Sequence, residues 1–206
     1  MHAPARPLAR LRQVVLGLAL SGLCGGCFLD ELVDGLDGIE EDEGVELKPS
    51  ADGRVRLSEE EWQTRLSEEE FAVLRGGRTE RAFTGALWQH DQRGTYLCAA
   101  CRLPLYDSRD KFDAGDGRPS FMRAIDGANI DASAEWNYGT LRIQLTCARC
   151  GSHLGYAYTG GPSTSGMRHS LNSLALDFET PRETARRVRR EAREHDRQEA
   201  WLSSAR

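Results

Sequence analysis

The chain has 206 residues, of which 39% are hydrophobic and 29% charged, a composition that suits one globular domain with appended segments better than two separate cores. Its formal net charge of −5 at pH 7 is unevenly distributed, because residues 28–47 hold nine acidic residues and no Lys or Arg. The sequence after them is nearly neutral and lacks the basic region that nucleic-acid-binding proteins carry. We therefore expect no nucleic-acid partner.

Residues 1–26 have the organisation of a secretory signal peptide. Basic residues occur only within residues 1–12, an apolar run covers residues 14–23, and Gly25-Gly26 end the segment. The apolar run is too short to cross a bilayer comfortably as a permanent helix. We expect an exported protein of the bacterial cell envelope.

Cys27 follows the two glycines directly, which resembles the lipobox of bacterial lipoproteins. We expect Cys27 to be the lipid anchor, with acyl chains holding the protein to a membrane. Cys24 stands where a lipobox usually has an aliphatic residue. Plain cleavage, or an anchor on Cys24, therefore stays open.

Residues 27–55 are acidic and interrupted by glycine, too polar to build a core, and we predict a solvated, disordered tether. Asp34, Asp37 and Asp42 are spaced loosely like calcium ligands, but the segment has no EF-hand loop, and we favour the tether.

A local repeat begins the predicted domain, which covers residues 56–178. Residues 56–62 and 65–71 each contain a Ser followed three positions later by Glu, the capping-box pattern of a helix start. We predict two short helices, the second ended by Gly76-Gly77. Their apolar residues should face the domain: Leu57, Trp62, Leu66, Phe71 and Leu74.

From about residue 80 to 178 the sequence consists of short apolar or alternating runs between turn residues, which is typical of antiparallel strands. Clear examples are residues 94–98, 103–106 and 141–145. Residues 179–206 start with a helix cap at Thr180 and form a charged helix with a thin apolar stripe. Its arginines are interspersed with acidic residues, so we expect no nucleic acid there either.

Four of the six cysteines form two matched pairs with two residues between partners, Cys98-Ala-Ala-Cys101 and Cys147-Ala-Arg-Cys150. Such a spacing lets both thiolates of a pair reach one ion, and two pairs complete the tetrahedral sulfur shell that structural Zn²⁺ prefers. We predict a structural zinc that joins two hairpins. Two disulfides, or metal-free dithiols acting as a redox switch, are the alternatives.

Local signatures in one collinear order now resemble a known family, the B-type methionine-R-sulfoxide reductases, also called peptide-methionine (R)-S-oxide reductases. The likeness covers residues 57–178. The segments that carry it are 66–71, 79–85, Tyr96-Leu-Cys-Ala-Ala-Cys101, Lys111-Phe-Asp113, Pro119-Ser-Phe121, Cys147-Ala-Arg-Cys-Gly-Ser-His-Leu-Gly155 and Asn172-Ser-Leu-Ala-Leu-Asp-Phe178. The resemblance implies a mainly β domain of two antiparallel sheets, clipped by the zinc site, between short N-terminal helices and the C-terminal charged helix.

The family's reaction needs a thiolate that attacks the sulfoxide sulfur and becomes a sulfenic acid. The resemblance places that nucleophile at Ser170, two residues before Asn172, and a serine hydroxyl cannot pass through sulfenic acid chemistry. A serine hydrolase built on Ser170 would need a base. His169 should point to the opposite face of its strand, which leaves His153 as the better candidate.

Three more positions depart from the family pattern. Tyr156 replaces a histidine, Arg118 replaces a tryptophan that walls the methyl pocket, and Asp116 stands where some members keep a recycling cysteine. The resemblance makes Arg118, His153, Tyr156, Arg168 and Asn172 the substrate-pocket residues.

These substitutions indicate a family member that kept the zinc-clipped fold and lost the thiol chemistry. We expect a module that binds oxidised or unoxidised peptides and proteins of the envelope. The alternative is an active peptide-methionine (R)-S-oxide reductase, so whether the protein is an enzyme stays open.

Overall fold

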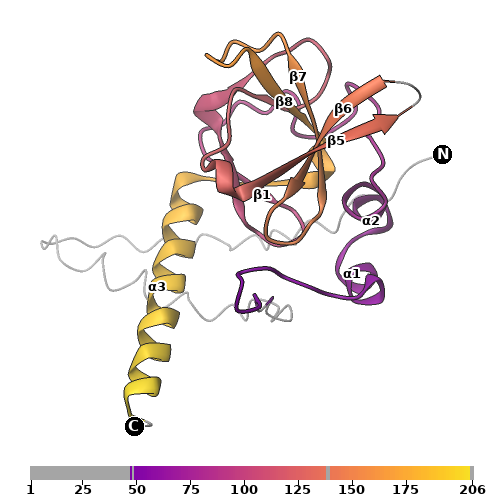
Figure 1. Cartoon of the computed structure of the whole chain (residues 1–206). Coiled ribbons are helices and arrows are strands. Elements are labelled where there is room, and N and C mark those ends of the chain that lie inside the picture. Colours follow the sequence, from indigo (N-terminus) through magenta and orange to yellow (C-terminus); the bar gives the residue numbers. More distant parts are fainter. Residues whose placement is uncertain (1–46, 48, 138–139, 205–206) are drawn as a thin grey trace, which may run out of the picture. The chain divides into compact units, whose positions relative to one another are not determined.

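The computed structural model describes residues 47, 49–137 and 140–204 of the chain (Figure 1). Residues 46–206 form one compact unit. The predicted signal peptide, Cys27 and most of the predicted tether lie outside the described residues. Among the helices that are described, none is both long and apolar enough to cross a membrane.

The two predicted short helices are present as α1 (Glu59–Arg65) and α2 (Glu68–Leu74). Each begins with a complete capping box, formed by a serine side chain and the glutamate three residues later. Trp62 and Leu74 are buried in the core, and Leu57, Leu66 and Phe71 pack against it half-buried. The inward face predicted from the sequence is therefore confirmed.

Nine strands form two antiparallel sheets within the described residues, as expected for a mainly β domain (Figure 1). The three-stranded sheet has the order β2 (Pro104–Asp107), β1 (Thr95–Cys98) and β9 (Leu176–Glu179). The six-stranded sheet has the order β3 (Lys111–Phe112), β4 (Ser120–Phe121), β8 (Met167–Leu171), β7 (His153–Thr159), β6 (Thr140–Cys147) and β5 (Ile130–Asn137). Single 3₁₀ turns occur at Ser108–Asp110, Gly127–Asn129 and Ser173–Ala175.

Aromatic rings join the two sheets into one core. Phe121 of β4 stacks on Tyr106 of β2, with ring centroids 4.5 Å apart, and meets Tyr96 of β1 edge-on at 5.0 Å. All three residues are completely buried. Because the three rings come from both sheets, the core holds the six-stranded sheet in a fixed position on the three-stranded one.

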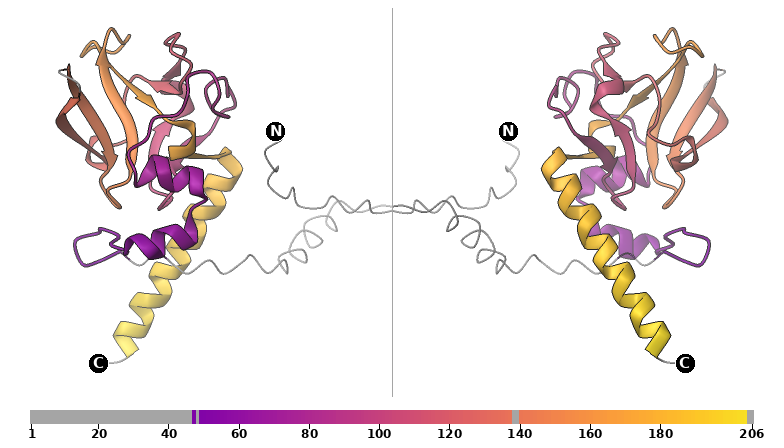
Figure 2. Two further views of the ribbon diagram at one scale, coloured as in Figure 1. Left: turned by 90° about the vertical axis from the view of Figure 1, so that its right-hand side faces the viewer. Right: turned by 90° about the vertical axis from the view of Figure 1, so that its left-hand side faces the viewer.

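The predicted charged helix is α3 (Pro181–Ser204), which leaves the strands at its first turn and extends away from them (Figure 2). Arg187 fixes the base of α3 to the domain through an ion pair with the buried Glu179. From Val188 onward every described residue of α3 is exposed, so the helix packs on the domain only at its start.

Candidate functional site

Ser170 lies in β8, between β4 and β7. It is directly opposite Ser120 on β4 and Tyr156 on β7. Since directly opposed side chains of an antiparallel sheet lie on the same face, these three side chains share one face, and Arg168, two residues before Ser170, lies on it as well. The predicted nucleophile position thus sits in a polar row across the six-stranded sheet.

A carboxylate accepts a hydrogen bond from the hydroxyl of Ser170. Ser170 Oγ donates a hydrogen bond to Oδ2 of Asp116 at 2.9 Å, and Arg168 Nη1 forms an ion pair with the same oxygen at 2.7 Å. The other oxygen of Asp116 accepts from the backbone N–H of Arg118 at 3.2 Å. Ser170 is 3% exposed. The side chains of Ser170, Asp116 and Arg168 form a hydrogen-bonded cluster, which we call the Ser–Asp–Arg cluster.

Arg118 and Asn172 both hold the backbone of Glu80. Arg118 Nη2 donates to the Glu80 carbonyl at 3.0 Å, and Asn172 Oδ1 accepts from the Glu80 N–H at 3.0 Å. Asn172 also donates from Nδ2 to the carbonyl of Leu154 at 3.3 Å. These contacts fasten the segment that follows α2 to the edge of the site.

His153 and Tyr156 are neighbours in the site, with ring centroids 5.2 Å apart. His153 is 3% exposed, and its Nδ1 lies 3.2 Å from the side-chain amide of Gln144. Burial lowers the pKa of His153, which therefore stays neutral near pH 7, and its Nε2 has no partner among the described residues. Burial also raises the pKa of Tyr156, over whose ring the guanidinium of Arg142 lies at 5.7 Å.

His169 does not act as a base for Ser170, because its side chain lies on the other face of β8. Its Nδ1 lies 2.9 Å from the hydroxyl of Tyr106, on the core side of β8. Burial lowers the pKa of His169 too. In the described part of the chain, neither His153 nor His169 forms a hydrogen bond with Ser170, so the structure lacks the serine–histidine pair that a hydrolase would need.

A close approach of two strands positions the serine. A Cβ on Gly155 would lie 2.2 Å from the carbonyl oxygen of Ser170 and 2.8 Å from Cα of Leu171. Both neighbouring atoms belong to the backbone and cannot turn away. Only glycine fits where β7 passes β8 at this point.

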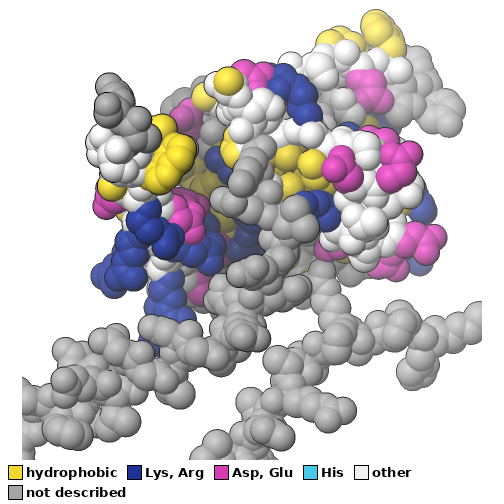
Figure 3. Space-filling view, turned by 90° about the horizontal axis from the view of Figure 1, so that it is seen from below, with side chains coloured by type: hydrophobic (Ala, Val, Ile, Leu, Met, Phe, Trp, Pro, Cys, Tyr) yellow, Lys and Arg dark blue, Asp and Glu magenta, His cyan; other side chains and the backbone are white. Residues whose placement is uncertain are grey.

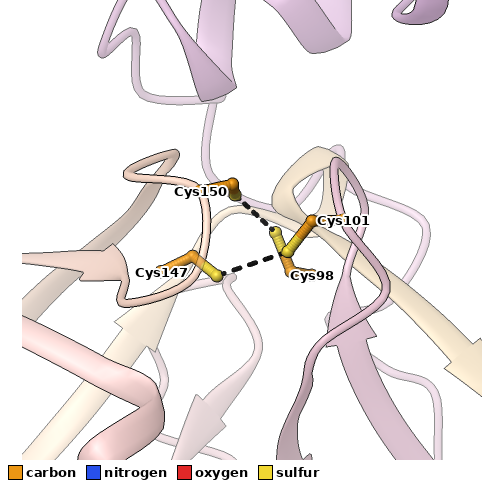
Figure 4. Close-up of side chains that lie close together, drawn as sticks. All are labelled: Cys98, Cys101, Cys147 and Cys150. Carbon is orange, nitrogen blue, oxygen red and sulfur yellow. Dashed lines mark hydrogen bonds between the residues drawn. The ribbon is translucent and has the colours of Figure 1, made fainter. Parts of the chain in front are cut away.

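The four paired cysteines meet in one buried group, which we call the four-cysteine cluster (Figure 4). Cys98 ends β1 and Cys147 ends β6, so each sheet contributes one pair. The sulfurs of Cys98 and Cys150 are 3.7 Å apart, and those of Cys101 and Cys147 are 3.6 Å apart. Four sulfurs at about 2.3 Å from one Zn²⁺ would be about 3.8 Å from each other, which the cluster nearly matches.

The two turns that carry the cluster share one conformation. The N–H after each pair donates to the carbonyl of the pair's first cysteine at 2.8 Å, from Arg102 to Cys98 and from Gly151 to Cys147. Both donors have positive φ, 61° and 71°. Contact with the neighbouring sulfurs raises the pKa of Cys98 and Cys101 and lowers the pKa of Cys147 and Cys150, so the four thiols hold their protons unevenly. None of the four forms a disulfide in the structure.

The described chain thus combines a four-cysteine cluster able to bind a metal ion with a polar site on a two-sheet core. A family model described as the SelR domain matches residues 66–180. The chain belongs to the B-type methionine-R-sulfoxide reductase family. It is 42% identical over 122 residues to a peptide methionine sulfoxide reductase MsrB of Alteromonas mediterranea, covering 59% of this chain and 86% of the relative. The likeness to the MsrB of Chromohalobacter salexigens is 44% over 126 residues, covering 61% and 95%.

Several side-chain contacts in the site could not be predicted from the sequence. The bond between Ser170 and Asp116 joins residues 54 positions apart, and no local pattern marks it. Gln144 and Ser120 also face the site, and neither was predicted to lie there. Ser120 could have been noticed, because it is the central residue of the Pro119-Ser-Phe121 segment that carries the family resemblance.

Proposed function

We propose that this protein is a reductase-family domain that binds peptide or protein segments without performing the family's thiol-dependent reduction. One observation carries the proposal: the hydroxyl of Ser170, at the family's nucleophile position, donates to Asp116, while every described cysteine belongs to the four-cysteine cluster. The described domain therefore offers no thiol to a substrate.

The chemistry of the reduction supports this assignment. The nucleophile must form a bond to the sulfoxide sulfur and then carry the oxygen as a sulfenic acid, which only sulfur or selenium can do. An oxygen nucleophile has no equivalent oxidised state. The carboxylate of Asp116, at the position where some members have a recycling cysteine, could not resolve a sulfenic acid either.

The site suits a polar ligand. Arg118 stands in place of an apolar wall, and its guanidinium borders the site while holding the Glu80 carbonyl. The buried rings of His153 and Tyr156 pack together as a neutral aromatic pair, and Nε2 of His153 is buried without a hydrogen-bond partner among the described residues. A methionine sulfoxide side chain, or another polar side chain of a peptide, has matching chemistry.

We further propose Zn²⁺ as the metal of the four-cysteine cluster and a lipid anchor on Cys27 in the cell envelope. Four thiolates at tetrahedral spacing favour zinc over the harder cations, and a closed sulfur shell makes it structural. The anchor rests on the lipobox resemblance of the sequence before Cys27.

The second candidate is an active reductase with an unrecognised nucleophile. It is favoured by relatives at about 40% identity whose names are peptide methionine sulfoxide reductase MsrB. That name belongs to those proteins, and the site described above lacks the thiol that their reaction would use.

An activity assay separates the two candidates. The full chain, loaded with zinc, is incubated with a peptide containing methionine-R-sulfoxide and dithiothreitol, and thioether formation is measured beside the Alteromonas mediterranea relative. We expect no turnover above the protein-free blank. We expect Ser170→Cys to restore little, because Arg118 and Tyr156 remain. Thioether formation by the unaltered chain would overturn the proposal.

Binding is tested separately with the same peptide in its sulfoxide and thioether forms, labelled for fluorescence anisotropy. We expect saturable binding that Arg118→Ala weakens several-fold, while Arg81→Ala, an exposed arginine nearby in the sequence, leaves it unchanged. No saturable binding of either peptide would reject the binding role and leave the assay of turnover unaffected.

A further inference from the structure

The helix α3 gathers its arginines along one side. Arg182, Arg186, Arg189, Arg193 and Arg197 follow one another at intervals of four, three, four and four residues, the spacing of a single helix face. We call this set the arginine stripe. It spans about 22 Å of helix at 1.5 Å per residue. Figure 3 shows Lys and Arg side chains gathered over this part of the molecule.

The arginine stripe faces away from the domain. All five of its residues are exposed, whereas Thr184 and Arg187, on the side of the helix nearest the strands, are half-buried. Arg187 is paired with Glu179 and Glu191. Among the described residues, none of the five stripe arginines forms an ion pair.

The acidic residues of α3 offset the stripe only in part. Hydrogen bonds from Thr180 lower the pKa of Glu183, and Arg186 is close enough to help lower the pKa of that carboxyl. Glu183 accepts from the backbone N–H and hydroxyl of Thr180, Glu191 pairs with Arg187, and Glu199 lies 3.2 Å from His195. At 100° per residue, four of the five acidic residues of α3 fall to the sides of the stripe or behind it, whereas Asp196, seven residues after Arg189, lies at the edge of the stripe. The net charge of α3 is therefore small, although its positive charges concentrate on one side of the helix.

We propose that the arginine stripe of α3 docks on a bilayer surface that carries anionic phospholipids. A flat surface contacts one face of a helix, and here that face presents five guanidinium groups, which bind phosphate in bidentate fashion, against the single carboxylate of Asp196. In a nucleic-acid groove, phosphates would approach the helix from both sides, where Glu194 and Glu199 would meet them. The flat, phosphate-rich surface is the partner that this charge distribution fits.

An exposed aromatic residue lies beside the last arginine of the stripe, at the flank of its end. Trp201 follows Arg197 by four residues, one turn further on, and its surface is 67% exposed. Tryptophan favours the boundary between headgroups and acyl chains, where its ring is buried and its N–H stays hydrated. The face thus combines charge along its length with an apolar anchor at its end, independently of any lipid on Cys27.

Quenching of Trp201 fluorescence tests the docking. The full chain is mixed with vesicles of brominated phosphatidylcholine, with or without brominated phosphatidylglycerol, and the signal of the Trp201→Phe chain is subtracted so that only α3 is reported. We expect quenching only with the anionic lipid. It should weaken strongly from about 0.1 M to about 1 M salt, as the Debye length falls from about 10 Å to about 3 Å.

Charge reversal identifies the stripe. R189E/R193E should raise the lipid concentration for half-maximal quenching at least about tenfold, since each arginine contributes noticeably near an anionic surface. R189Q/R193Q should give a smaller shift in the same direction. The control R78E/R81E makes the same change of net charge at exposed arginines outside α3 and should bind like the unaltered chain.

Three results would overturn the proposal: equal quenching by neutral vesicles, no effect of R189E/R193E in a chain whose circular dichroism shows α3 intact, or an equal effect of the control. A chain that binds a mixed-sequence DNA duplex in a salt-dependent way, yet shows no quenching by anionic vesicles, would assign the stripe to nucleic acid and reject the membrane.

Discussion

Asp116 is the residue that gives the site its present form. One of its oxygens takes both the Ser170 hydroxyl and the Arg168 guanidinium, and the other takes a backbone N–H. The side chains of Arg168 and Asp116 are only 19% and 22% exposed, so water replaces these bonds poorly. The carboxylate of Asp116 therefore stabilises the site in a way that a thiol could not, because a thiol accepts hydrogen bonds weakly and carries no charge when protonated.

Replacing this carboxylate should destabilise the domain. We expect Asp116→Ala to lower the free energy of unfolding by about 1–3 kcal/mol, because it leaves Ser170 and a largely buried guanidinium without their acceptor. Urea denaturation followed by circular dichroism measures the change. Asp91→Ala removes the same charge from an exposed position and should have little effect. Equal losses in the two variants would show that the Ser–Asp–Arg cluster contributes nothing to stability.

Only part of this site could be predicted from the sequence. The cysteine pairs were predictable because the partners of each pair are three positions apart, and a short turn fixes their geometry. The Ser–Asp–Arg cluster was not, since Asp116 reaches Arg168 across 52 positions through a loop whose course depends on packing. His169 lay between the two cases, because strand alternation alone placed it away from Ser170.

At the level of elements, the same division holds between local and distant interactions. Both short helices and α3 were predictable from capping residues, which act within one turn. The strand order β3-β4-β8-β7-β6-β5 was not, because it pairs β4 with β8 across the sequence between them. Apolar alternation marks a strand and its inner face but carries no information on its neighbour.

The crossing of β7 and β8 is the element-level feature most sensitive to substitution. We expect Gly155→Ala to destabilise the domain by about 1–3 kcal/mol or more, because the added methyl group would overlap the backbone of Ser170 and Leu171. Thermal unfolding provides the measurement, and a chain that no longer folds is the extreme of the same result. Gly127→Ala, where no atom lies within 4 Å of the new group, is the control. An unchanged melting temperature in Gly155→Ala would mean that the strands separate freely.

At the scale of the whole molecule, we expect the four-cysteine cluster to contribute strongly to stability when it holds a metal ion. We expect one zinc and four titratable thiols from the cluster per chain after denaturation, and we expect chelation to unfold residues 46–206, since zinc in a sulfur shell can contribute on the order of 10 kcal/mol. Metal analysis measures the zinc content, and near-ultraviolet circular dichroism follows unfolding on chelation. Cys150→Ser should lose the metal, and Cys27→Ser should keep it. A chelated chain that retains its melting curve would instead support metal-free dithiols and the redox-switch alternative.

The distribution of the four cysteines along the chain also dictates when the molecule can fold. Cys101 and Cys147 are 46 positions apart, and β1 acquires its second neighbour only with β9 near the end of the domain. A growing chain that stops short of Cys147 has one half of the sulfur cluster and an open sheet edge. Contacts of such long sequence separation form slowly. We therefore expect folding and metal capture to be late, post-synthetic events, with the incomplete chain most open to proteolysis and aggregation.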